Sequence, residues 1–187
     1  ALLFIDLDRF KYVNDSFGHR AGDILLQTVA ARLRDCVRET DTVCRHAGDE
    51  YVIVLSALRD PAEAAIVAGK VLATFDEPFP LENQEVRISA SVGISVYPED
   101  GQTTEDLIRN ADAAMYHSKK NGRNRYEFFT PELTAPVAER LVLANQLRRA
   151  IERNQLALHY QPQFDTAGNT LLGAEALVRW HHDEHGL

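Results

Sequence analysis

The chain has 187 residues, 45% of them hydrophobic, which is enough for one ordinary domain with a buried core and part of a second. Its 28 acidic and 20 basic residues give a formal net charge of −8, which argues against sequence-independent binding to nucleic acid or to an anionic membrane surface. No apolar run has the length of a bilayer-spanning helix and no secretion signal is evident. We therefore expect a cytoplasmic segment, and a membrane anchor elsewhere in a longer parent protein stays open.

The predicted elements begin with residues 1–5, which are apolar throughout and indicate a strand buried on both faces. This strand delivers Asp6 and Asp8 at the point where the apolar run stops. Residues 9–20 are polar and typical of turns. A helix is expected over 22–39, because its apolar residues recur at helical spacing.

A hairpin is expected over 42–55, with Gly48, Asp49 and Glu50 at its tip. A small residue at a tip lets the backbone approach a ligand closely, and two neighbouring carboxylates repel each other until a cation binds. Asp6 ends the first strand and is available to share that cation. Two groups of acidic residues borne by strands therefore predict a divalent-metal site.

The next part of the chain alternates helices and strands. Helices are expected over 61–75 and 103–120, the second of which begins with a capping-box pattern, and strands over 86–96 and 125–129. Because a hairpin and crossover connections both occur, this order favours an α+β fold with a central, mostly antiparallel sheet flanked by helices over a doubly wound fold.

The character of the chain changes at Pro131. A charged helix is expected around 138–153, followed by two strands over 156–164 and 171–180 that flank a turn. A second domain begins here. We therefore predict a first domain, a linker helix and the start of a second domain, over residues 1–130, 131–155 and 156–187.

Several motifs follow one another in an ordered series over about residues 1–130. They are FIDLDRFK at 4–11, FGH at 17–19, RHAGDEY at 45–51, SVGIS at 91–95 and KKNGRN at 119–124. Together they resemble the GGDEF family of diguanylate cyclases, and so long an ordered set is far more specific than a Gly-Asp-Glu turn alone. The chain departs from the family pattern at Ala47, where glycine is usual, and at Tyr51, where phenylalanine is usual.

The resemblance implies that two GTP molecules are condensed into cyclic di-GMP and pyrophosphate by a homodimer that holds one GTP in each protomer. It also implies a sheet similar to the polymerase and nucleotidyl cyclase palm, with a ferredoxin-like βαββαβ core, and Mg²⁺ or Mn²⁺ as cofactor. The implied metal ligands are Asp6, the backbone carbonyl of Leu7, Asp49 and Glu50, and the last two are also the implied catalytic residues. Asp8 is interpreted as structural.

The resemblance also implies a set of substrate contacts. An amide and a carboxylate can together recognise the edge of guanine, which suits Asn14 and Asp23. His19 stays open between a nucleotide contact and a local hydrogen-bond partner. The matching positions are Asn14, His19, Asp23, Gly48, Lys119 and Arg123, and the last two match contacts to phosphate.

A separate product site is implied by Arg38 and Asp41. They match the Arg-x-x-Asp pattern that binds cyclic di-GMP in this family and inhibits the enzyme, with Arg45 as a helper. Taken alone, such a pair is a surface ion pair worth well under about 1 kcal/mol. Guanidinium groups suit this ligand, because they bind phosphate with two parallel hydrogen bonds.

The end of the chain, at 158–163 and 173–180, resembles the opening of an EAL domain, a barrel phosphodiesterase that opens cyclic di-GMP. Glu175 would match a metal ligand there. A barrel of this kind needs about 250 residues, so we do not expect hydrolysis by this segment. For His181, His182 and His185 we expect a solvated loop in preference to a zinc site.

Two functions from different classes stay open. One is a GTP-condensing enzyme, and the other is a non-catalytic module that binds GTP or cyclic di-GMP and regulates an adjoining EAL phosphodiesterase. A cyclase that closes a single nucleotide on itself is a weaker third interpretation, because Asn14 and Asp23 match the guanine pocket of the dimer-forming family.

Overall fold

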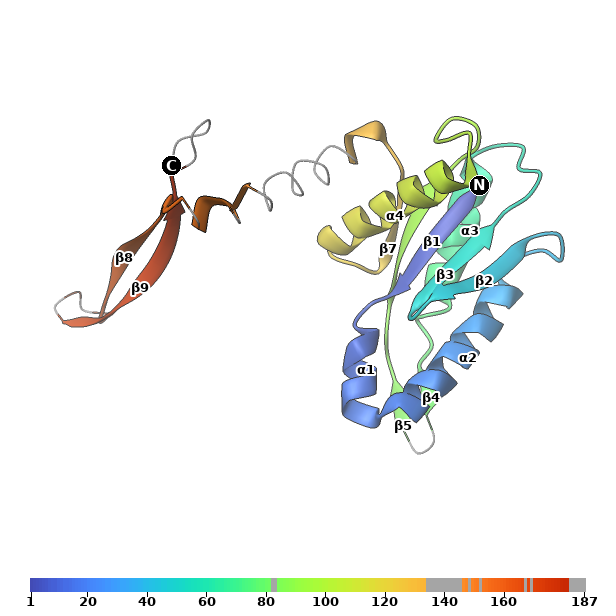
Figure 1. Cartoon of the computed structure of the whole chain (residues 1–187). Helices are drawn as coiled ribbons and strands as arrows, with labels where there is room; N and C mark the ends of the chain where they lie inside the picture. Colours follow the sequence, from blue (N-terminus) through green and yellow to red (C-terminus); the bar gives the residue numbers. More distant parts are fainter. Residues whose placement is uncertain are drawn as a thin grey trace. The chain divides into compact units, whose positions relative to one another are not determined.

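The computed structural model of the chain describes residues 1–81, 84–133, 146–147, 149–151, 153–166, 168 and 170–181. It divides into two compact units, Ala1–Ala135 and Pro136–Leu187, and each is described by itself (Figure 1). None of the helices in the described ranges is both long and apolar enough to cross a bilayer.

A five-stranded sheet forms the centre of the first unit, in the order β2-β3-β1-β6-β7. Its strands are β1 (Leu2–Leu7), β2 (Thr42–Ala47), β3 (Glu50–Val54), β6 (Ala90–Ser95) and β7 (Arg125–Phe128). β1 pairs antiparallel with both β3 and β6, whereas β7 runs parallel to β6. The predicted α+β class with a mostly antiparallel sheet is confirmed.

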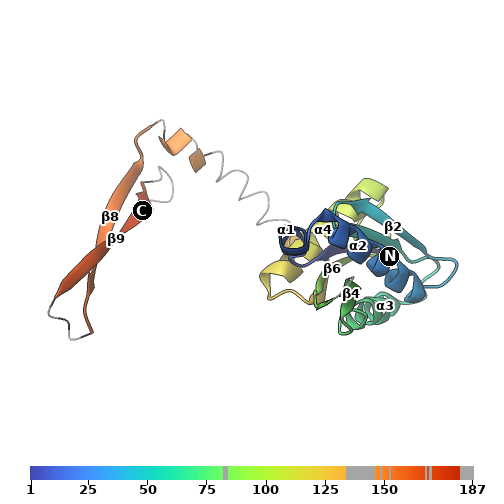
Figure 2. The ribbon, with the colours of Figure 1, turned by 90° about the horizontal axis from the view of Figure 1, so that it is seen from below.

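Helices cover both faces of this sheet (Figure 1 and Figure 2). They are α1 (Phe10–Phe17), α2 (His19–Asp35), α3 (Ala62–Ala73) and α4 (Thr104–Lys120), and a 3₁₀ turn follows at Pro131–Leu133. Successive residues of a strand point to opposite faces. Leu3, Ile5 and Leu7 therefore pack in the core that includes α2 and α3, while Leu2 and Phe4 pack against α4. By the same alternation Asp6 lies on the α4 face.

The position of α4 is set by a close approach to β6. A Cβ atom on Gly93 would lie 1.9 Å from the carbonyl oxygen of Ala111, so only glycine lets the helix backbone come this near. The helix begins where the hydroxyl of Thr103 accepts a hydrogen bond from the backbone N–H of Asp106 at 3.1 Å. Its last turn carries Lys119.

Two parts of the first unit differ from the prediction. Residues 9–20 were expected as turns, but α1 occupies most of them, because Phe10 and Val13 lie three residues apart and are buried on one side of that helix. Gly18, with a φ of 82°, separates α1 from α2, which ends at Asp35. The strand expected over 86–96 is interrupted, because β5 (Gln84–Val86) pairs with β4 (Phe79–Leu81) in a separate hairpin.

The second unit contains the antiparallel strands β8 (Leu156–Phe164) and β9 (Leu171–Trp180), as predicted. Of the predicted linker helix, residues 134–145, 148 and 152 lie outside the described residues, and so do His182 and His185.

Candidate active site

Two carboxylates oppose each other where β1 and β3 pair. Asp6 and Glu50 are register partners in the antiparallel ladder, so their side chains leave the same face of the sheet. Asp49 precedes Glu50 in the turn, and its carbonyl oxygen lies 3.3 Å from the backbone nitrogen of Leu7, which donates to it. Like charges directly opposite each other destabilise a ladder. This end of the sheet therefore favours a bound cation.

The electrostatics of Asp6 reflect this arrangement. Only 8% of the residue is exposed, and burial raises the pKa of its carboxyl group. A hydrogen bond from Lys119 lowers this pKa, while the charges of Asp49 and Asp8 raise it. The Nζ atom of Lys119 lies 2.6 Å from Oδ2 of Asp6. The ammonium group of Lys119 therefore offsets the charge of Asp6, which lies among other carboxylates.

No group of three or more His, Cys, Asp or Glu side chains is already arranged to hold a metal ion in the part of the chain that the structure describes. The chemistry of the donors nevertheless fits a divalent cation, because Asp6, Asp49 and Glu50 supply carboxylate oxygens of the kind that Mg²⁺ prefers. Asp6 also already carries one cation, the ammonium group of Lys119.

The two departures from the family pattern lie on either side of the hairpin turn, at Ala47 on β2 and Tyr51 on β3. Gly48 takes the left-handed conformation, with a φ of 51°, so the turn places its positive φ one residue after Ala47. Nε of Arg45 donates to the carbonyl oxygen of Gly48 at 2.9 Å and thereby holds the turn. Tyr51 is 1% exposed, and its hydroxyl donates to the carbonyl oxygen of Leu26 at 2.8 Å. Burial raises the pKa of this phenol.

The residues predicted to contact guanine lie on α1 and α2. A Cβ atom on Gly22 would lie 2.0 Å from Oδ1 of Asn14, so the two helices touch at this point. Asn14 is half-buried, whereas Asp23 and His19 are exposed. The structure thus brings Asn14 to the helical turn that carries Asp23.

Asp8 organises the loop that carries Arg123. Its buried carboxylate accepts hydrogen bonds from Oγ of Ser89 at 2.6 Å, from Oγ of Ser91 at 2.8 Å and from the backbone N–H of Asn124 at 3.3 Å. Nε of Arg123 lies 3.8 Å from Oδ1 of Asp8, the oxygen that also accepts from Ser91. Arg123 and Asn124 both have positive φ angles, 63° and 47°. Asp8 therefore holds a strained turn in place, in keeping with its structural interpretation.

Of the three residues of the predicted product site, Arg38 and Asp41 lie together and Arg45 lies apart. The backbone N–H of Arg38 donates to Oδ2 of Asp41 at 3.0 Å, and its guanidinium group lies 3.4 Å from Glu63. These three residues line a cavity of about 100 Å³. Arg45 does not line it, because its side chain is at the hairpin tip.

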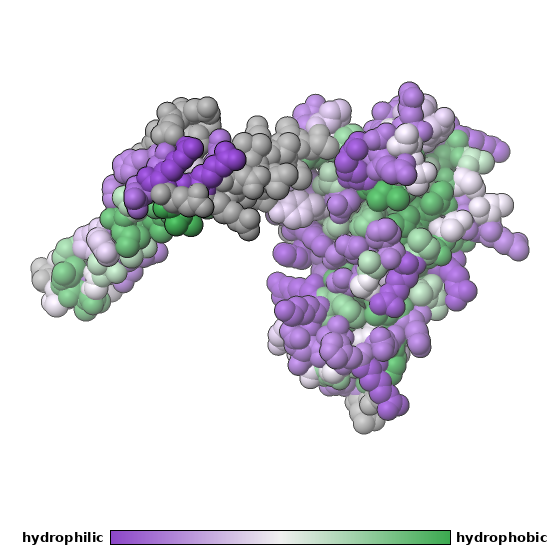
Figure 3. Space-filling view, viewed as in Figure 1, coloured by the Kyte–Doolittle hydropathy of each residue, from purple (hydrophilic) through white to green (hydrophobic). Residues whose placement is uncertain are grey.

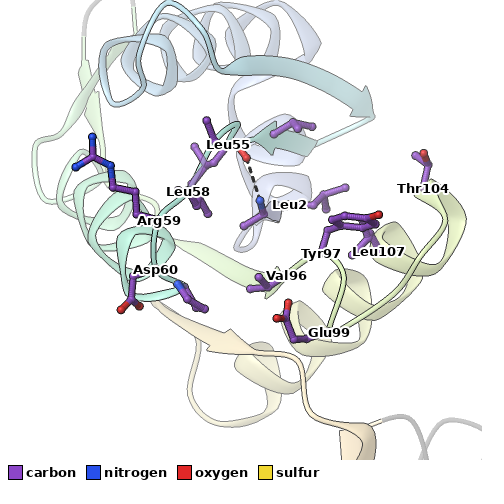
Figure 4. A pocket seen from close by; sticks show the side chains of 14 residues that line it. Leu2, Leu55, Leu58, Arg59, Asp60, Val96, Tyr97, Glu99, Thr104 and Leu107 are labelled. Atoms are coloured by element: carbon purple, nitrogen blue, oxygen red, sulfur yellow. Dashed lines mark hydrogen bonds between the residues drawn. The ribbon is translucent and has the colours of Figure 1, made fainter.

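The first unit also has two larger cavities. One, of about 590 Å³, surrounds the beginning of β1 and is lined by residues such as Leu2, Leu55 and Tyr97, with no predicted site residue among them (Figure 4). The other, of about 690 Å³, lies beside α1 and includes Arg123.

Glu175 belongs to the second unit, where it is exposed on β9 opposite Gln161.

Sequence reasoning missed several partners of these residues. Ser89 and Asn124 are 81 and 116 positions from Asp8, and local spacing carries no signal for contacts at such separations. Glu63 was likewise not linked to Arg38, because they lie on different elements.

Comparison with known proteins identifies the family. The model of the family described as diguanylate cyclase, GGDEF domain, matches residues 1–125, and the EAL domain model matches residues 144–187. The chain therefore belongs to the GGDEF family, and a segment that matches the EAL domain model follows.

Individual relatives agree with this assignment. The chain is 51% identical over 187 residues to the bifunctional diguanylate cyclase/cyclic di-GMP phosphodiesterase MucR of Pseudomonas aeruginosa, covering 100% of this chain and 27% of MucR. It is 42% identical to the cyclic di-GMP phosphodiesterase NbdA of the same organism, covering 24% of NbdA. A solved GGDEF domain of PA1120 (YfiN or TpbB), also from P. aeruginosa, has a TM-score of 0.71 at 37% identity and covers 73% of this chain and 80% of that one. The chain thus spans about a quarter of the length of these curated relatives.

Proposed function

We propose that residues 1–130 form a diguanylate cyclase domain that condenses two GTP molecules into cyclic di-GMP and pyrophosphate. The observation that carries this proposal is the pairing of Asp6 with Glu50 across β1 and β3, one residue from Asp49 in the turn. Membership of the GGDEF family and the similarity to MucR support it. GTP is a cytoplasmic nucleotide, so we place this domain in the cytoplasm.

The chemistry we propose is the attack of each ribose 3′-hydroxyl on the α-phosphorus of the other GTP, with one pyrophosphate leaving at each of the two attacks. Asp6, Asp49, Glu50 and the carbonyl of Leu7 would hold Mg²⁺ or Mn²⁺. Bound there, the cation would lower the pKa of the hydroxyl group and neutralise charge on the phosphates. Glu50 would also accept the hydroxyl proton.

The remaining site residues would bind and orient the nucleotide. At the guanine edge, the amide of Asn14 would donate and accept hydrogen bonds and the carboxylate of Asp23 would accept them, with exposed His19 on the same helix as Asp23. The backbone of Gly48 would lie against the nucleotide, and Lys119 and Arg123 would contact its phosphates. Because each protomer would hold one GTP, the active form would be a homodimer.

Product inhibition is a separate part of the proposal. Arg38 and Asp41, which line one small cavity, would bind cyclic di-GMP and lower turnover. Arg45 would act at the hairpin tip and stabilise the turn through its hydrogen bond to Gly48. Residues 131–155 would form the linker helix, and residues 156–187 would begin the EAL domain without hydrolytic activity of their own, with Glu175 as a metal ligand of the complete barrel.

A second candidate function is regulation without catalysis. It is favoured by the EAL match at 144–187 and by the similarity to NbdA, which is named as a phosphodiesterase. In this case the first unit would bind GTP or cyclic di-GMP and control an adjoining EAL domain.

One assay distinguishes the two functions. The chain is incubated with GTP and Mg²⁺, and pyrophosphate and cyclic di-GMP are quantified for the wild type, Asp49→Ala and Glu50→Ala, with Asp76→Ala as an exposed acidic control. We expect two pyrophosphates for each cyclic di-GMP, with amounts that agree within twofold between the wild type and the control, and a loss of at least about a hundredfold for either site variant. Turnover that survives both substitutions would remove the catalytic assignment. Saturable nucleotide binding without turnover would establish the regulatory function instead.

A further inference from the structure

Lys119 and Asp6 form an ion pair between residues of two different ligand sets. Asp6 belongs to the proposed metal ligands, and Lys119 belongs to the proposed phosphate contacts. Their charged atoms are 2.6 Å apart. The side chain of Asp6 is only 11% exposed and that of Lys119 is 27% exposed. Lys119 therefore contacts the oxygen of Asp6 that a metal ion would require, and Asp6 holds the ammonium group that a phosphate would require.

We propose that Lys119 is a displaceable counter-ion for the metal position. Its ammonium group neutralises Asp6 while no metal is bound, and it transfers to the phosphates when a metal–nucleotide complex arrives. This inference rests on the proposed function of the site. It adds a competition between the protein's own cation and the metal for the same carboxylate oxygen.

The charges around the pair explain why a resident cation is needed. Asp6 lies opposite Glu50 in the ladder and is also affected by the charges of Asp49 and Asp8. Asp112, two turns before Lys119 on α4, also lies within the electrostatic reach of this lysine. Arg123 lies 3.8 Å from Asp8, but the cation that faces Asp6 is Lys119. Removing the ammonium group would therefore leave the buried Asp6 carboxylate beside other negative charges without its cation.

The side chain of Lys119 is suited to exchange one anion for another. Lysine is a compact charge on a flexible stem with three donors, so its ammonium group can move without disturbing the backbone. The backbone of α4 is held in place independently, by the approach to Gly93 and by the Thr103 cap. The exchange is thus confined to a side chain.

A thermodynamic consequence follows. A metal ion that arrives alone must break the Lys119–Asp6 pair without compensation, whereas a metal–nucleotide complex offers phosphate to the displaced lysine. Metal and nucleotide should therefore strengthen each other's binding, and by reciprocity the factor is the same in both directions. Lys119 would make loading of the site cooperative and disfavour binding of metal alone.

The test measures Mn²⁺ binding to the full chain by electron paramagnetic resonance in the absence of nucleotide. We expect Lys119→Met to bind Mn²⁺ at least about fivefold more tightly than the wild type, because the competing cation is gone. Lys120→Met is the matched control, since it removes the same charge from the next residue, whose Nζ instead lies 4.7 Å from the ring centroid of Tyr116. It should change the affinity less than twofold. Lys119→Gln repeats the first variant with a polar side chain.

Equal Mn²⁺ affinities of the Lys119 and Lys120 variants would overturn the inference, as would weaker binding by Lys119→Met. A further arm adds a non-hydrolysable GTP analogue, which should tighten Mn²⁺ binding more in the wild type than in Lys119→Met. Asp6→Asn separates this inference from the proposed function. If Asp6→Asn binds Mn²⁺ as well as the wild type, Asp6 is no ligand and the proposed metal site fails. If it loses binding but Lys119→Met gains none, only the counter-ion role fails.

Discussion

Strand β1 of the first unit and strand β9 of the second are both rich in apolar residues, yet their surroundings differ. All six residues of β1 are buried, because helices cover both faces of the sheet around it. On β9, Leu172 is 70% exposed and Val178 is 59% exposed, and hydrophobic residues are visible on the surface of the β8–β9 hairpin (Figure 3). Apolar composition therefore predicts a strand, whereas the number of layers that cover it depends on contacts with distant segments.

The same difference gives two strand carboxylates different chemistry. Asp6 at the end of β1 is buried, with a raised pKa and a lysine at 2.6 Å, because α4 covers that face of the sheet. Glu175 on β9 is exposed. A two-stranded hairpin is marginal by itself in water, so a carboxylate on it lacks the second layer that would desolvate it and fix its partners.

The largest expected effect tests this contrast at two strand glycines. Gly93→Ala would place its Cβ atom 1.9 Å from the backbone oxygen of Ala111, and since that backbone cannot yield cheaply we expect a loss of about 3 kcal/mol or more. Gly173 on β9 has no heavy atom within 4 Å of its ideal Cβ position, so Gly173→Ala should cost less than about 0.5 kcal/mol. Urea unfolding followed by circular dichroism measures both. Similar losses of unfolding free energy for the two variants would contradict the close packing of α4 on β6 at Gly93.

The second prediction compares two large apolar side chains. Ile53 on β3 is fully buried, so Ile53→Ala should destabilise the first unit by about 2–5 kcal/mol through lost burial and a residual cavity. Leu172 on β9 is 70% exposed, and Leu172→Ala should stay within about 0.5 kcal/mol. The free energy of unfolding comes from urea titration. A Leu172 loss as large as that of Ile53 would mean that β9 is covered in solution.

A third prediction concerns buried polar groups in the first unit. Asp8→Ala removes the acceptor for Ser89, Ser91 and the backbone N–H of Asn124, so we expect a loss of about 2–3 kcal/mol. Asp15→Ala, an exposed acidic residue on α1, is the control and should cost less than about 0.5 kcal/mol. Thermal unfolding measures both variants. Equal melting temperatures would show that the network around Asp8 contributes nothing to stability.

The sequence allowed the main elements and the sheet class to be predicted, because hydrophobic periodicity and turn residues are local signals. It failed at α1, where only Phe10 and Val13 mark the buried side of a polar helix, and at the β4–β5 pairing. Family motifs predicted Asp6, Glu50 and Lys119 as site residues but not that Lys119 would pair with Asp6. Asp6 and Lys119 lie near opposite ends of the sequence of the first unit, so local spacing carries no signal for their contact. The contact depends on how α4 packs on β6.

The smallest expected effect concerns the beginning of α4, the helix that gives β1 its second layer. Hydrogen bonds from the hydroxyl of Thr103 and from Arg109 lower the pKa of Asp106 below its ordinary value. The ionised form is therefore favoured in the folded state, and the stabilisation is present above the unfolded pKa and disappears as pH falls through the folded one. The melting temperature of the wild type should exceed that of Asp106→Asn at pH 7, and the gap should close as pH falls below about 4. Glu105→Gln, an exposed neighbour in the same turn, controls for the loss of a negative charge near the helix start. A gap that persists unchanged in acid would mean that the carboxamide perturbs α4 by a route other than charge.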